Sequence, residues 1–526
     1  MKRFKSLKLA LPALATSAVL GMTSMAPVQA AEDAAGAGDF NFALSGYARA
    51  WLSFNLEQQS ELSDVGKNSK WAVSMLRGSV LLDADASYAG LKFKAITRLD
   101  REYRTGYLKD LQKLRSPGQA GVDTSGGKDI TENYNNFDFR ELWVEAPLGD
   151  RTTVKFGRQQ LVWGESDFFQ ALDLVHGYDF SWRLFFEGEN EEWRKPLILL
   201  STKIRVPEYD GLIAAFIRPG WDRCSDIGNT YDISGGRWFF QPYRGFDLTQ
   251  VTDKNCEHKS GDQDDITGGI RWQAEAFGIN YSIAYVKTFA ADPVANVNAN
   301  PFKGDGGVVA GNFFDRIHPE IDVIGLTLSG YSDALDSVLS AEMAYIIDQP
   351  YNVGTGGFLA PDVPPGIGIG LDGIKEKDAL RVMVRADKNL NFQDVLGTTR
   401  PSFSSIQIFN TTILNFKKSD DLVRLFAFGS RIRENNTIFT AFTVLNYRND
   451  EINPGFAIGF DLSNGGGFAI PSVAFTLSDA WVGKVEADIF WSGGRNNKNQ
   501  FSPENSQLFG YFEGASQLAF RLTRQF

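Results

Sequence analysis

The residues best able to bind a ligand gather in one stretch, residues 163–196, where charged and aromatic side chains are dense. Carboxylates and guanidiniums at this density could form ion pairs and hydrogen bonds that dock the stretch against a wall of protein. The aromatic rings beside them could line an apolar pocket. The candidate site residues are Trp163, Glu165, Phe168, Phe169, Asp173, Asp179, Trp182, Arg183, Glu192 and Arg194.

Three roles are open for these residues. They could only hold the stretch in place, they could contact a ligand directly, or they could belong to an exposed lid. The apolar residues within residues 168–175 recur at helical spacing, which predicts a short helix. Ser166 or Asp167 could cap its start.

The sequence gives little indication of an enzyme. Hydrolases need a nucleophile or a water activated by a base, usually His. The chain has three His, and it has neither a G-x-S-x-G nor an H-E-x-x-H motif. We therefore expect no catalytic residue and no cofactor. A Ser/His or Asp/His dyad around His176, which has Asp173 and Asp179 nearby, is the open alternative.

The two cysteines of the chain, Cys224 and Cys256, lie in one polar stretch rich in Gly and Asp. Exported proteins usually pair their cysteines, so we predict a disulfide that pins an outer loop, residues 220–264. A bridge of this kind stabilises a fold by roughly 3–4 kcal/mol in the chain-entropy model. We expect no metal, because few His lie nearby. Calcium held by loop carboxylates such as Asp262 and Asp264 is the weaker alternative.

The elements around these candidates alternate with a period of two. In residues 40–56, one face carries mainly Phe, Leu and Ala, and the other carries mainly Asn, Ser and Arg. In residues 91–100, charged residues occupy nearly every second position, which suits a wet lumen better than a buried sandwich. Short turns, such as those at Ala89-Gly90 and Phe277-Gly278, alternate with long loops.

This rhythm predicts an all-β fold, a transmembrane antiparallel up-and-down β-barrel. We expect about 16 strands, within a range of 14–18, and we count residues 423–432 among them. Residues 163–196 do not follow this alternation, so we expect them to fold into the lumen as a partly helical insert.

The chain ends in a strand whose apolar face carries Leu518, Phe520, Leu522 and Phe526. This strand resembles the recognition strand of Gram-negative outer-membrane proteins, although Arg524 stands where an apolar residue is usual. The resemblance implies that the last strand closes the barrel against the first strand. It also implies recognition by the barrel-assembly machinery.

The first thirty residues have the features of a signal peptide. Four cations precede an uncharged run that ends near Met25, and Val28 to Ala30 form a small-x-small cleavage site. Removing this segment lowers the formal net charge from −11 to −15, which argues against nucleic acid as a partner. We therefore expect a single barrel domain over residues 31–526, in contact with lipid in the outer membrane of a Gram-negative bacterium.

One motif resembles the outer-membrane proteins known as domain-of-unknown-function family 1302. The matching residues are Arg158, Gln159, Trp163, Gly164, Glu165, Asp173, Val175, Asp179, Glu192, Arg194 and Pro196. The chain departs from the family at His176-Gly177, where Asn-Pro is usual. The resemblance implies an outer-membrane barrel, with a LolA-like periplasmic partner and an inner-membrane exporter. It also implies the handling of hydrophobic compounds such as alkanes, sterols or terpenoids.

We accordingly expect an outer-membrane transport channel for hydrophobic small molecules of the alkane, fatty-acid, sterol or terpenoid type. One alternative is a water-filled porin for polar solutes. The other is a surface interaction protein or phage receptor that uses the disulfide-pinned loop.

Overall fold

A computed structural model describes residues 40–114, 129–184, 190–239, 241, 244–298, 303–305, 307–308, 310–354, 370–424, 430–493 and 508–526. The expected signal peptide and its cleavage site near Ala30 lie outside these residues. So do residues 185–189 of the stretch that we expect to enter the lumen.

Eighteen of the described strands form one closed antiparallel barrel. In order around the wall they are β1 (Asn41–Asn55), β2 (Val73–Tyr88), β3 (Leu91–Glu102), β4 (Asn136–Leu148), β5 (Thr152–Gln159), β6 (Leu197–Val206), β7 (Gly211–Arg218), β11 (Thr267–Ala276), β12 (Ile279–Phe289), β15 (Glu320–Ser332), β16 (Ser337–Val353), β17 (Ile374–Leu390), β18 (Ser402–Ile413), β21 (Asn435–Val444), β22 (Ile452–Asp461), β23 (Gly467–Ser478), β24 (Trp481–Trp491) and β25 (Gln517–Gln525). Each strand pairs with the next, and β25 pairs with β1 to close the ring.

The expected number of 16 strands is wrong, although 18 lies within the expected range. A barrel whose two termini lie at the same end needs an even number of strands, and both 16 and 18 meet this requirement. Residues 423–432, which we expected to form a wall strand, contribute to two short strands, β19 (Leu422–Arg424) and β20 (Ser430–Arg431). These pair with the end of β16 and with each other.

The remaining elements lie in the connections between wall strands. They are α1 (Ser60–Ser63), α2 (Gly106–Leu114), α3 (Asn190–Trp193), α4 (Gln393–Leu396), the 3-10 helices η1 (Ile130–Asn133), η2 (Pro207–Tyr209), η3 (Cys224–Asp226), η4 (Leu248–Gln250), η5 (Lys418–Asp420) and η8 (Gly510–Ala515), and the short strands β8 (Thr252–Lys254), β9 (Glu257–His258), β10 (Gly261–Asp262), β13 (Val294–Val297) and β14 (Phe314–Ile317). Among the described residues, no helix has the length and apolar character needed to span a membrane.

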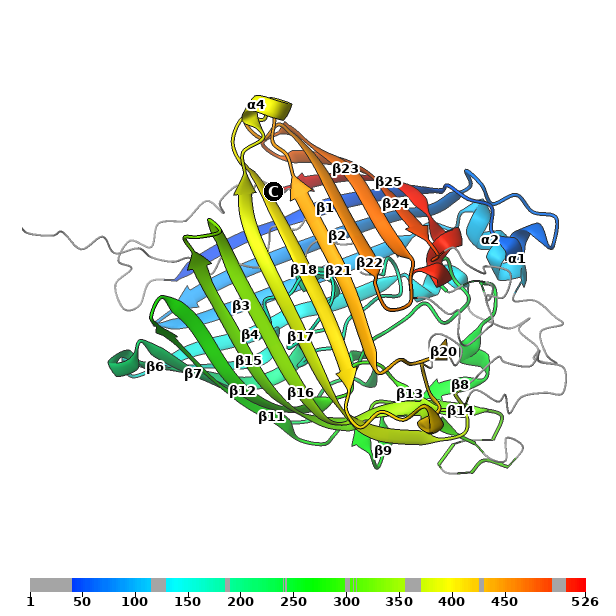
Figure 1. The fold of residues 1–526 in the computed structure, drawn as a ribbon, viewed down its shortest axis with the longest axis horizontal. Helices are drawn as coiled ribbons and strands as arrows, with labels where there is room; N and C mark the ends of the chain where they lie inside the picture. The colour runs from blue at the N-terminus through cyan, green and yellow to red at the C-terminus, as the bar shows by residue number, and fades with distance from the viewer. Residues whose placement is uncertain are drawn as a thin grey trace, which may run out of the picture.

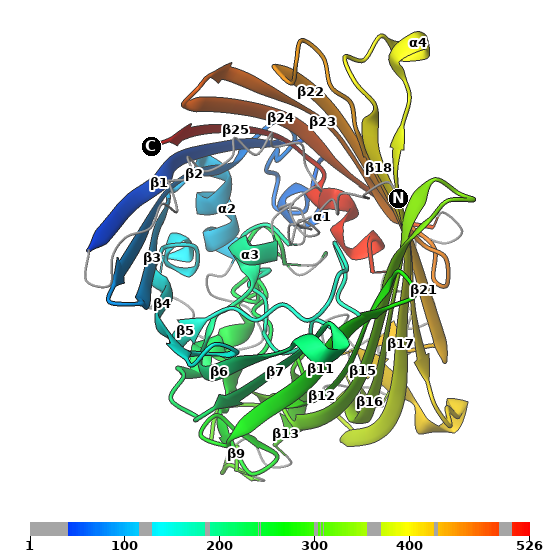
Figure 2. The same ribbon diagram turned by 90° about the vertical axis from the view of Figure 1, so that its left-hand side faces the viewer.

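Short turns join the strands at one end of the barrel, and longer connections join them at the other. The β2–β3 turn consists of Ala89 and Gly90, both with positive φ, and the β11–β12 turn consists of Phe277 and Gly278, also with positive φ. Two such residues form the tight hairpin turn that matches the twist of the strands, which confirms both predicted turns. Figure 1 shows the tilted strands side by side, with α1 and α2 at the long-loop end. In Figure 2, which looks into the barrel, α2 and α3 lie within the ring of strands.

The two faces of the wall differ as the alternation predicts. On β25, Phe520 and Leu522 are 37% and 41% exposed on the outside, whereas Arg521 and Thr523 are buried on the inside. Other exposed apolar residues of the outer face include Phe42, Leu82, Phe93, Leu142, Ile270, Ile283, Ile324, Val384, Ile406 and Phe456. An apolar outer face of this extent is what a wall in contact with lipid needs.

Replacing an outward residue near the middle of β25 tests whether this face contacts lipid. We expect Phe520→Arg to lower the stability of the folded barrel in bilayers by about 2–4 kcal/mol, because a cation is costly in hydrocarbon. Urea titration in lipid vesicles measures the loss, and Phe520→Leu is the matched control. Equal stability of the two variants would contradict a lipid-facing β25.

Candidate functional site

The insert, residues 163–196, leaves the wall after β5 and returns to it at β6. Its side chains reach well-separated parts of the ring. On β1, Arg49 lies 2.7 Å from Glu192 of the insert. On β17, Arg385 lies 2.6 Å from Asp167 of the insert. The described part of the insert therefore crosses the lumen between the two walls.

The helix expected over residues 168–175 is wrong, because helix occurs in the described part of the insert only at α3. Phe168 has a φ of 62°, in the left-handed region that an α-helix does not use. The backbone N–H groups of Glu165 and Leu172 both donate to the Glu342 carboxylate on β16. The wall of the barrel thus supplies hydrogen-bond acceptors that a helix would have supplied from its own carbonyls.

Glu192 lies where the insert meets β1 and β3. Its carboxylate is 2.7 Å from Arg49 Nη1, and its backbone carbonyl accepts a hydrogen bond from Arg98 at 2.8 Å. Burial would raise the pKa of Glu192, but Arg49 and Arg98 outweigh burial and lower it to about 2. The carboxylate is therefore an anion held between two cations. Buried ionic residues of the wall around it form what we call the charged sector: Arg49, Arg77, Arg98, Asp100, Glu102, Asp138 and Arg140.

Two further ion pairs attach the insert to other strands. Arg183 pairs with Glu486 on β24 and lies 3.3 Å from Asp488, and all three side chains are at most 2% exposed. Asp167 pairs with Arg385. Its carboxylate therefore does not cap a helix, contrary to the expectation from the sequence. Charges taken out of water in this way persist only where each has an opposite partner.

Arg194 and Asp173 form an ion pair within the insert itself. Tyr178 adds a hydrogen bond from its hydroxyl to the same carboxylate at 2.7 Å. This three-residue contact joins the first half of the insert to its end, so Asp173 and Arg194 have a positioning role.

His176 and Gly177 stand where the family motif has Asn-Pro, and each has a structural explanation. His176 Nδ1 donates to the Lys195 carbonyl at 3.0 Å, and Nε2 accepts the Leu161 N–H at 2.9 Å. Burial lowers the pKa of His176, and the positive charge of Arg194 lowers it further, to about 3. The ring is thus neutral, and both nitrogens are engaged by backbone. A Cβ at position 177 would collide with the Gly228 carbonyl, so only glycine permits this close approach.

The other predicted insert residues make packing or turn contacts. Trp163 packs edge-on against Phe216 of β7, with 5.3 Å between ring centroids. Trp182 packs against Trp51 of β1 at 6.1 Å. Asp179 accepts two hydrogen bonds from the residue two positions further along the chain. The two tryptophans are buried in these contacts, and Asp179 supports a local turn of the insert.

Phe168 and Phe169 meet a second part of the wall, where the inner face is apolar. We call this wall, from β17 round to β24, the aromatic sector, and its inward residues are Met383, Phe409, Ile438, Phe442, Ala457, Phe468, Ile470 and Phe490. Phe168 lies 6.1 Å from Phe442, and Phe169 lies 5.6 Å from Phe409, between ring centroids. A cavity of about 390 Å³ remains between the insert, this sector and the end of β16. We call it the aromatic cavity.

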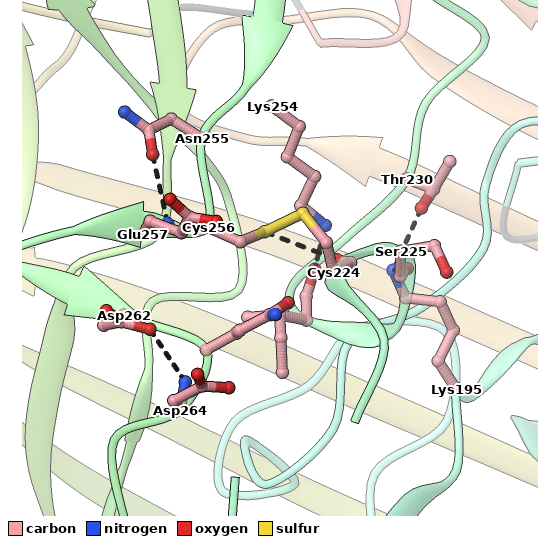
Figure 3. The surroundings of a disulfide bond; sticks show 12 residues. Lys195, Cys224, Ser225, Thr230, Lys254, Asn255, Cys256, Glu257, Asp262 and Asp264 are labelled. Atoms are coloured by element: carbon pink, nitrogen blue, oxygen red, sulfur yellow. Dashed lines mark hydrogen bonds between the residues drawn. A yellow bond between two sulfur atoms is a disulfide. The ribbon is translucent and has the colours of Figure 1, made fainter. Parts of the chain in front are cut away.

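Cys224 and Cys256 form the predicted disulfide, with Cα atoms 5.7 Å apart. The segment that they close does not simply project outward, because Trp238 is 3% exposed and lines the aromatic cavity. Figure 3 shows Lys195 of the insert beside the disulfide, where its Nζ donates to the Ser225 carbonyl at 2.9 Å. The disulfide-linked segment and the insert therefore contact and stabilise one another.

The loop carboxylates considered for calcium make local contacts. Asp262 accepts the Asp264 N–H at 2.9 Å. Within the residues that the structure describes, no group of three or more His, Cys, Asp or Glu side chains is arranged to hold a metal ion.

The aromatic sector is the part of the site that sequence reasoning missed. Inward positions of a transmembrane barrel are expected to be polar, so the alternation rule assigns large apolar residues to the outer face. The available signal is a local loss of alternation. On β18, Ile408 is exposed outside while Phe409 is buried inside, and on β21 the adjacent Ile438 and Phe439 are both apolar.

Residues 11–526 match the family described as "Protein of unknown function (DUF1302)". The chain belongs to this family. The match spans nearly the whole chain, which confirms the resemblance seen in the insert motif. No curated protein matches the sequence.

Solved structures that align with this chain include porins. A BenF-like porin from Pseudomonas fluorescens aligns over 93% of this chain and 98% of its own, at 9% identity and a TM-score of 0.44. OpdK of Pseudomonas aeruginosa, solved with vanillate, aligns over 92% and 98%, at 7% identity and 0.43. OmpF of Salmonella typhi, in complex with daunomycin, aligns over 92% and 97%, at 11% identity and 0.39.

Removing one partner of a buried ion pair tests whether the insert is anchored as described. We expect Arg183→Leu to lower stability by about 3–5 kcal/mol, because Glu486 and Asp488 lose a buried partner. The exposed pair of Arg151 and Glu208 provides the control, and Arg151→Leu is expected to leave the stability almost unchanged.

Denaturant titration of both purified variants measures this difference, and limited proteolysis reports release of the insert. An Arg183→Leu variant as stable as Arg151→Leu would contradict the anchoring role.

Proposed function

We propose that the chain is an outer-membrane channel that guides hydrophobic small molecules, of the alkane, fatty-acid, sterol or terpenoid type. The observation that supports this proposal best is the aromatic cavity. A lumen that passes only ions or sugars does not need an apolar inner wall, nor an apolar part of the insert that faces this wall. A cavity of this size falls within the range of small-molecule sites, which are mostly apolar.

In this proposal the insert makes the channel selective. It crosses the lumen and is attached to β1, β17 and β24 by buried ion pairs. We propose that it narrows the route that a solute can take. Apolar molecules gain about 0.8 kcal/mol for each CH₂ that leaves water, so they would partition into the aromatic cavity. We propose passage through the lumen and no catalysis. A LolA-like periplasmic protein and an inner-membrane exporter are the partners that would hand molecules on.

A water-filled porin is the second candidate, because the charged sector would suit polar solutes. Conductance in planar bilayers separates the two candidates. Large and stable current steps favour the porin, whereas small or absent steps favour a guided apolar route. The surface-receptor alternative has less support, since the disulfide-linked segment is largely packed against the insert and the lumen.

Uptake of an apolar compound tests the proposed function. We expect Phe169→Ala to slow uptake of an alkane or sterol by about ten-fold, because the ring lines the aromatic cavity and a lost aromatic contact costs about 1.5–3 kcal/mol. The matched control is Phe456→Ala, which removes an exposed ring from the outer face.

Radiolabelled uptake into proteoliposomes gives the rates, and gel mobility before and after heating shows that both variants are folded. Equal uptake by vesicles with and without the protein would overturn the proposed function.

A further inference from the structure

The aromatic cavity has an unusual charge balance for an apolar site. Among its described lining residues are four guanidiniums, those of Arg381, Arg424, Arg431 and Arg433. The two carboxylates are Asp232 and Asp292.

Both carboxylates already have donors. Asp232 accepts the Tyr134 hydroxyl at 2.7 Å and the Trp238 N–H at 2.9 Å. Asp292 accepts the Asn229 amide at 2.8 Å. The cavity therefore presents an excess of positive charge to whatever enters it.

Among the residues that the structure describes, Arg431 is the one of these four arginines with a carboxylate within ion-pair distance, and Arg381 and Arg424 are two of the other three. Arg431 lies 3.5 Å from Asp421. By contrast, across the described ranges of the chain, no carboxylate lies within ion-pair distance of Arg381 or Arg424. Both are only partly exposed, so their charges are incompletely hydrated. A cation in this position gains most from an anion that arrives with the ligand.

Arg381 and Arg424 both line the aromatic cavity. Arg381 lies on the inner face of β17, two residues from Met383 of the aromatic sector, which is about 7 Å along a strand. Arg424 follows Val423, which pairs with Asn352 at the end of β16. Tyr351, near the end of β16, lines the same cavity as both arginines.

We propose that the aromatic cavity binds amphipathic anions, with the apolar body against Phe169 and Phe409 and a carboxylate at Arg381 and Arg424. This inference rests on the proposed function and narrows it, because neutral alkanes and alcohols bring no anionic partner for the two guanidiniums, which have none among the described residues. A hydrophobic acid satisfies the aromatic rings and the cations together.

Calorimetric titration of the full-length protein in nanodiscs tests this inference, with decanoate and decanol as the two probes and empty nanodiscs subtracted. At a pH where decanoate is ionised, we expect it to bind about ten-fold more tightly than decanol or better. The double variant Arg381→Gln, Arg424→Gln is expected to lose this preference and to keep its affinity for decanol. Arg151→Gln removes a cation far from the cavity and is expected to keep the preference.

The outcomes separate the two proposals. Equal affinity of the unaltered protein for both probes would overturn the anion site and leave the proposed function standing. A preference that survives in the double variant would also overturn it. If neither probe binds and apolar uptake is absent as well, both proposals fail.

Discussion

The insert stays inside the barrel because its buried charges have partners only there. Glu192 needs Arg49, Asp167 needs Arg385, and Arg183 needs Glu486, and the partner in each pair comes from a different strand of the wall. A pair of this kind contributes little net stability compared with apolar packing, but leaving either member alone is costly. The ion pairs therefore select one position for the insert. They do so from several directions at once, which a single contact could not achieve.

This constraint divides the lumen. On the side of β1 to β4 the insert meets ionic side chains, and from β17 to β24 it meets Phe, Met and Ile side chains. An empty barrel of this size would be filled with water. With the insert held across it, the described lumen offers an ionic environment on one side and an apolar cavity on the other. The disulfide of Cys224 and Cys256 supports the same arrangement, because the segment that it closes contacts the insert through Lys195.

Sequence alone predicted the wall well and the interior poorly. Alternation follows from the pleat of a strand, so it correctly placed Phe520 and Leu522 outside and Arg521 inside. It could not choose between 16 and 18 strands, since residues 423–432 alternate like a wall strand, yet their described part forms only two short strands, of which β19 pairs with the end of β16. The helix over residues 168–175 failed because Glu342, distant in sequence, takes the N–H groups of Glu165 and Leu172. The sequence did not predict inward apolar residues such as Phe409, because their burial depends on the side chains that the insert places opposite them.

Side chains of the barrel wall hold the insert in place through the backbone and the charges of the insert. Hydrogen exchange of the protein in lipid tests this attachment at the amides of Glu165, Asp167 and Leu172, which donate to Glu342 and Gln407. We predict that these amides exchange as slowly as those of the neighbouring strands, over hours. Exchange within seconds, as in an exposed loop, would contradict the account.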